Sequence, residues 1–133
     1  MDNTEELLKF HKDLLWWTYM IDFAETEIIF IHKLLNSAAF ESKNPNLFEK
    51  LQIFKDQIQK ETGELGNLKV EIQEHRKKME GMIECDDLSC DTLYLKNHEL
   101  MKKKFEIFFK NFSEYMSKIL NYTGSILKTK SGN

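Results

Sequence analysis

Apolar residues recur along this chain in alternating steps of three and four, the period of helices that pack nearly parallel or antiparallel. The pattern runs through three long segments, about 4–40, 45–81 and 89–127. We therefore predict three long helices, each with one buried stripe. The stripe of the first comprises Leu7, Phe10, Leu14, Trp17, Ile21, Ala24, Ile28, Ile31, Leu35 and Ala38.

The other two segments carry the same pattern, but polar residues interrupt their stripes. In the second segment the stripe comprises Leu51, Phe54, Ile58, Glu61, Leu65, Leu68, Ile72, His75, Met79 and Met82. In the third it comprises Tyr94, His98, Met101, Phe105, Phe108, Phe112, Tyr115, Ile119, Tyr122 and Ile126. Polar residues on a buried stripe are candidates for function or for fixing the register of the helices.

The breaks between segments are short, so sequential helices should run antiparallel. Pro45 suits the first turn of a helix, and the pattern continues in phase across Gly63 and Gly66, which favours an unbroken second helix. The predicted fold is all-α: a long up-down-up antiparallel three-helix bundle with coiled-coil-like packing, forming a single domain over 1–133. A tight first connection would place Trp17 opposite Leu68.

Composition agrees with a globular helical protein. The 133 residues are 41% hydrophobic and 31% charged, with a net charge of −3, five glycines and one proline. The acidic start MDNTEELLKF predicts no export signal, and the longest apolar runs fall far short of the ~20 residues of a membrane span. We expect a cytoplasmic protein with no membrane partner.

Two histidines on facing stripes form the first candidate site. Antiparallel pairing places His75 opposite His98, with Phe10 in the same layer and His11 beside it. Imidazoles on facing helices can bind a transition metal such as zinc, iron or copper, so His11, His75 and His98 are a candidate ligand set. Further or outer ligands could come from Asp13, Glu71 or Glu99. In the alternative, His75 and His98 pack on aromatic rings and hydrogen-bond either each other or water, and His11 lies in solvent.

Glu61 is the second candidate, because a carboxylate on a buried stripe is unfavourable unless it is paired. Glu25 of the first segment, with His32 seven residues after it, could join Glu61. Such a group could transfer protons or hold a metal. Alternatively, Glu61 reaches solvent near the glycines or bonds Tyr115.

Two further clusters favour ordinary interpretations. Cys85 and Cys90 lie among acidic residues with a spacing wider than the CxxC pairs of zinc sites, which favours free thiols in a turn. The lysine run at 102–104 indicates a solvated face, and we expect no nucleic-acid partner.

The first segment carries a second apolar face, whose members are Trp16, Met20, Phe23, Ile29, Phe30 and Leu34. Such a face commonly meets a partner, so we expect a homodimer or a complex with another helical protein. In the alternative, the face belongs to a wider core with Phe109 and Met116. Acidic residues along the same segment disfavour binding to anionic lipid.

No phosphate-binding loop, nucleophile elbow or HExxH motif is found. The expected function is therefore that of a non-enzymatic helical interaction or scaffold protein without a cofactor. Two alternatives remain open: a metal-binding bundle, and a carrier of a small apolar ligand if Ala24 opposite Phe112 leaves a cavity.

Overall fold

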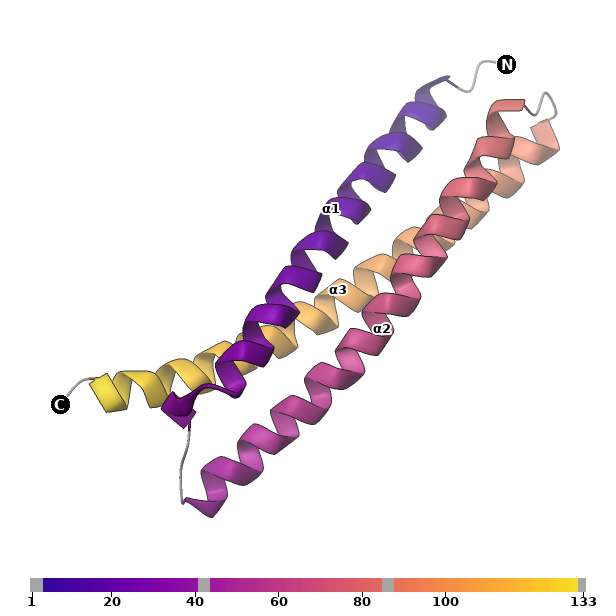
Figure 1. Ribbon diagram of the computed structural model, residues 1–133. Helices are drawn as coiled ribbons and strands as arrows, with labels where there is room; N and C mark the ends of the chain where they lie inside the picture. Colours follow the sequence, from indigo (N-terminus) through magenta and orange to yellow (C-terminus); the bar gives the residue numbers. More distant parts are fainter. Residues whose placement is uncertain (1–3, 41–43, 85–87, 132–133) are drawn as a thin grey trace.

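The computed structural model describes residues 4–40, 44–84 and 88–131, which fold into three long helices (Figure 1). These are α1 (Thr4–Leu35), α2 (Pro45–Glu84) and α3 (Leu88–Ser131), with a short 3₁₀ helix, η1 (Ala38–Phe40), after α1. α2 packs against both α1 and α3, and successive long helices run in opposite directions. The predicted all-α three-helix bundle is confirmed.

α1 ends at Leu35, about a turn before the predicted end at residue 40. The Asn36 side chain donates a hydrogen bond to the His32 carbonyl at 2.8 Å, and the Ser37 hydroxyl accepts one from the Ala39 amide at 3.2 Å. Side chains that bond the nearby backbone in this way compete with helix continuation. The chain therefore turns into η1.

α2 passes Gly63 and Gly66 without interruption, which confirms the prediction of an unbroken second helix. All ten predicted stripe positions of α2 are buried. In α1, eight of the ten predicted positions are buried. For these two helices the 3.5-residue period therefore identifies the core face.

The buried stripe of α3 departs from the prediction. Phe109, Met116 and Thr123 are buried, whereas the predicted Phe108, Tyr115 and Tyr122 are only partly buried. A straight α-helix has 3.6 residues per turn and drifts by about 20° per heptad relative to a 3.5 repeat. The stripe accommodates this drift with two successive steps of four, from Met101 to Phe105 and from Phe105 to Phe109.

The register of α1 on α2 also differs from the prediction. The Trp17 ring lies 6.2 Å from the His75 ring, centroid to centroid, although Leu68 was its predicted partner. Lys69 Nζ lies 2.9 Å from Glu25 Oε1. The connection that contains η1 is not a tight reversal, so α2 begins beyond the end of α1 (Figure 1).

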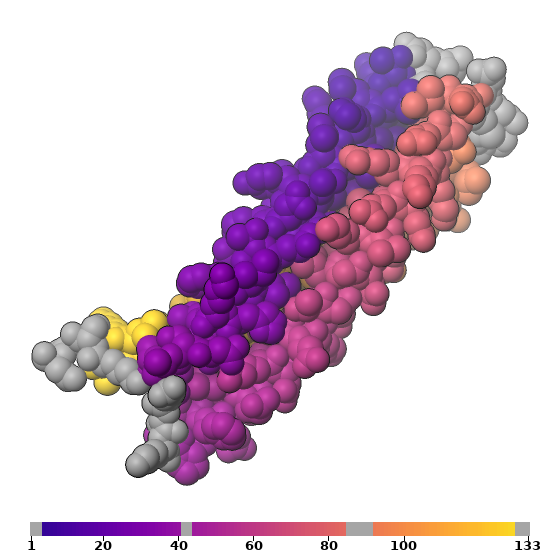
Figure 2. All heavy atoms as spheres, viewed as in Figure 1, coloured from indigo at the N-terminus to yellow at the C-terminus, as the bar shows by residue number. Residues whose placement is uncertain are grey.

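The core is one long apolar cluster with a smaller cluster at one end. The main cluster extends through all three helices, from Leu14 on α1 to Ile119 on α3, in an elongated molecule (Figure 2). The smaller cluster joins Phe10, Met79 and Met82. Among the described residues, none of the helices has the length and apolar character that a membrane crossing requires.

Candidate functional site

A chain of hydrogen-bonded polar side chains links all three helices between the two apolar clusters. His98 of α3 lies at its centre and is fully buried. Its Nε2 lies 2.8 Å from Oδ2 of Asp13 on α1, and its Nδ1 lies 2.9 Å from Nε2 of His75 on α2. The Phe10 and Trp17 rings pack on the His98 imidazole at centroid distances of 4.2 and 4.9 Å.

The Asp13 carboxylate, which lies at one end of the three side chains, determines the direction of both hydrogen bonds. An ionised carboxylate only accepts, so His98 donates from Nε2 to Asp13 and is left, when neutral, with an acceptor at Nδ1. His75 must then donate from Nε2 to His98. Both histidines therefore adopt the tautomer with hydrogen on Nε2. The hydrogen bonds among Asp13, His98 and His75 then form without a protonated histidine.

Burial favours this neutral state. Burial, followed by the charges of His98 and Lys78, lowers the pKa of His75 from 6.5 to about 4. Burial also lowers the pKa of His98, although its hydrogen bond to Asp13 acts in the opposite direction. Near pH 7 the two rings are thus neutral hydrogen-bonding partners within the core.

The predicted three-histidine metal site does not form. His11 lies exposed on α1, and the described residues contain no group of three or more His, Cys, Asp or Glu side chains placed to hold a metal ion. Two imidazole ligands of tetrahedral zinc would have nitrogens about 3.3 Å apart, given Zn–N bonds of about 2.0–2.1 Å. The His75–His98 separation of 2.9 Å is instead that of a hydrogen bond.

Glu61 lies in the core of α2, as predicted, with only 5% of its surface exposed. Its Oε1 accepts a hydrogen bond from Gln57 Nε2 at 3.1 Å, while its buried Oε2 has no partner among the described residues. Burial raises the pKa of Glu61, and the nearby charge of Glu64 raises it further. Neither the expected route to solvent nor the expected bond to Tyr115 satisfies this carboxylate.

Glu25 does not join Glu61 in a buried pair. It lies in the partly exposed ion pair with Lys69, on the surface of the α1–α2 contact. His32, the third residue of this candidate site, lies in the last turn of α1. The predicted carboxylate site therefore reduces to Glu61 alone.

The second apolar face of α1 divides into two parts. Met20 and Leu34 pack partly buried against the main core, to which α3 contributes Phe109 and Met116, as the wider-core alternative predicted. The other four members, each more than half exposed, are Trp16, Phe23, Ile29 and Phe30. Three further α1 residues that the pattern did not single out are equally exposed: Leu8, Leu15 and Tyr19.

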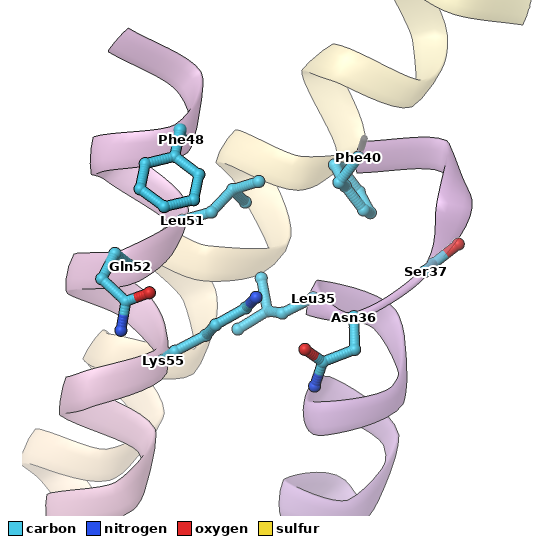
Figure 3. A pocket seen from close by; sticks show the side chains of 8 residues that line it. All are labelled: Leu35, Asn36, Ser37, Phe40, Phe48, Leu51, Gln52 and Lys55. Carbon is cyan, nitrogen blue, oxygen red and sulfur yellow. The ribbon is translucent and has the colours of Figure 1, made fainter. Parts of the chain in front are cut away.

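A pocket of about 340 Å³ lies where α1, η1 and the start of α2 meet (Figure 3). Leu35, Phe40 and Leu51 give it a buried apolar floor, and the half-buried side chain of Lys55 extends between its walls. Within the described part of the chain, no carboxylate lies within ion-pair distance of Lys55. The sequence pattern does not indicate this pocket, because it depends on the early end of α1.

The predicted ligand cavity between Ala24 and Phe112 takes a different form. Ala24 is fully buried in the main core. At this level a groove of about 330 Å³ opens instead between Met20 and Phe23 on one side and Phe112 and Met116 on the other. The groove runs beside the exposed face of α1.

Two candidates remain, the cysteine pair and the lysine run. Cys85 and the side chain of Cys90 lie outside the described residues. In the lysine run, Lys104 pairs with Glu71 of α2. No family model, no curated protein and no solved structure matches the chain, so its function is argued from its own residues.

Proposed function

We propose that this protein is a non-enzymatic helical interaction module that self-associates through the outer face of α1. The observation that carries the proposal is the row Trp16, Phe23 and Phe30. These residues are spaced seven apart on one side of the helix, and each is more than half exposed. Exposed large apolar residues gathered on one face commonly mark an interaction surface.

The size of this face suits a second copy of the chain. An aromatic side chain buries 150–250 Å² in a core, so half-exposed Trp16, Tyr19, Phe23 and Phe30 together offer about 300–500 Å². A standard interface buries about 800 Å² on each partner, so these four rings would supply about half of one side of it.

The face also has the composition of an interface centre. The Trp16 and Tyr19 rings stack at a centroid distance of 5.7 Å, so this part of the surface is ordered before any partner binds. Tryptophan and tyrosine dominate binding energy at the centres of interfaces. Ordering in the free protein reduces the entropy that association would otherwise remove.

The test is the solution mass of the wild-type chain and of two matched variants. We expect sedimentation equilibrium to give about twice the 15.9 kDa of the chain. Phe23→Lys should give a monomer, because a charged side chain would be buried without a partner. Phe48→Lys changes a phenylalanine on α2 that is also more than half exposed, and it should leave the dimer intact.

Circular dichroism and thermal unfolding of both variants must first show an intact bundle. A wild-type chain that is monomeric at several hundred micromolar would contradict the proposal. So would equal weakening of the dimer by Phe23→Lys and Phe48→Lys.

A second candidate function is the binding of a small amphipathic anion in the pocket of Figure 3. The observation that favours it is Lys55 above an apolar floor, with no ion-pair partner among the described residues, since ligand sites combine apolar walls with a few polar groups. We expect NMR titration with octanoate to shift the amides around this pocket, and Lys55→Met to weaken binding. Lys60→Met is the matched control, and equal affinity for octanol and octanoate would argue against recognition of the anion.

A further inference from the structure

The polar chain formed by Asp13, His98 and His75 separates the two apolar clusters of the bundle. Phe10, which packs on one side of His98, belongs to the small end cluster with Met79 and Met82. Trp17, on the other side, belongs to the main core. Beyond this layer, the small apolar cluster and surface contacts such as Lys9–Glu99 at 3.8 Å connect the N-terminal turns of α1 to the bundle, and contacts of the latter kind are weak.

The geometry of Asp13, His98 and His75 limits the number of protons that these side chains can take up while they stay hydrogen-bonded. One added proton is accommodated: His98 donates to Asp13 and to His75, which changes tautomer to accept at Nε2. A second proton is not accommodated, because N–H groups would then face each other across the 2.9 Å between His98 Nδ1 and His75 Nε2. The closed layer therefore takes up at most one added proton, whereas two solvated neutral histidines take up two in mild acid.

Other charged groups act on the layer from all three helices. α1 contributes Asp13 and Lys9, and α3 contributes Glu99. On α2, Lys78 lies close enough to oppose protonation of His75. His75 also lines a surface pocket of about 270 Å³ whose other charged residues are Glu71, Glu74, Lys78 and Lys104. Asp13 alone among these accepts a hydrogen bond from the buried rings.

We propose that Asp13, His98 and His75 form a proton-operated latch that holds the N-terminal half of α1 on the bundle. Opening separates the layer and exposes Phe10, Met79 and Met82, while the main core from Ile21 onward stays closed. Mild acid drives the opening because the open state binds at least one proton more than the closed state. The apolar end of the bundle thereby becomes available only at low pH.

The size of the response follows from proton linkage. Each extra proton bound on opening changes the opening constant by up to tenfold per pH unit below the ordinary histidine range. Between pH 6.5 and 5.0, one proton on a histidine with the ordinary pKa of about 6.5 corresponds to a change of about 16-fold. Burial lowers the pKa of both rings in the closed state, which is the direction that this linkage requires.

Hydrogen exchange of the full chain, corrected for intrinsic rates and run at one protein concentration, tests the latch. We expect protection in residues 8–17 to fall at least about 16-fold between pH 6.5 and 5.0, with a much smaller change in residues 21–31. His75→Gln retains an N–H donor for His98 but cannot be protonated. Its loss of protection in residues 8–17 should be about 16-fold smaller than that of the wild type.

His11→Gln removes an exposed histidine of α1 and should show the same loss of protection as the wild type. Three results would overturn the latch: unchanged protection in residues 8–17, an equal loss in both segments, or a full acid response in His75→Gln. If His75→Gln does not fold, the wild-type comparison of the two segments still decides the question.

Discussion

Replacing Glu61 should stabilise the bundle, because its carboxylate is buried with one oxygen unbonded. The informative change is Glu61→Met, which keeps an unbranched chain of similar length and removes both oxygens. A buried polar group without a partner costs about 1–3 kcal/mol, and more when it is charged. The only bond lost is that from Gln57, at 3.1 Å, worth about 1 kcal/mol. We expect a net gain of about 1–2 kcal/mol at pH 7.

The gain should depend on pH in a defined direction. Burial raises the pKa of Glu61 in the folded protein above the unfolded value near 4.5. The folded state therefore keeps a proton that the unfolded state has already lost, so wild-type stability falls as pH rises through this range. Below about pH 4 both states are protonated, and the part of the gain that arises from ionisation disappears.

Urea unfolding of wild type and Glu61→Met, followed by circular dichroism at pH 4, 5, 6 and 7, measures both effects. Comparing the two proteins at each pH cancels the contribution of His75 and His98, which is common to both. Glu61→Gln is the control that removes the charge but keeps the shape and the contact with Gln57. A Glu61→Met protein less stable than wild type at pH 7, or a gain that is the same at every pH, would refute the reasoning.

The glycines of α2 provide a further prediction. A Cβ added at Gly63 or Gly66 would have no atom within 4 Å, so each alanine substitution should raise the free energy of unfolding by about 1 kcal/mol, measured by urea unfolding. At Gly81 a Cβ would lie 2.5 Å from the Tyr94 hydroxyl oxygen, so Gly81→Ala forces Tyr94 to move and should lack this gain. A destabilised Gly63→Ala or Gly66→Ala protein would show that α2 is not a regular helix at these positions.

The core faces of α1 and α2 could be predicted from local pattern alone. A side chain's direction on a helix depends on its position within a turn, so apolar residues spaced three and four apart must share a face. For α3 the same rule was insufficient, because Phe108 and Phe109 are both apolar. Only packing against the other helices selects Phe109 for the core.

The contact between two of the three residues of the polar layer could also be predicted. The facing of His75 and His98 follows from the short connection between α2 and α3, which leaves little freedom in their register. His11 does not join the two other histidines, because it lies on the flank of α1, where a small rotation decides between core and solvent. Asp13, expected as a further or outer metal ligand, is the residue that completes the layer.

The sequence by itself determined the helix count, the connection order, and the burial of Glu61, His75 and His98, because these depend on period and loop length. The tertiary structure alone decided the register of α1 on α2, the rotation of α3 and the pocket beside Lys55. Each of these is set by contacts between residues far apart in the chain. The pattern along one helix contains no information on which residues of another helix it meets, so it cannot predict the register.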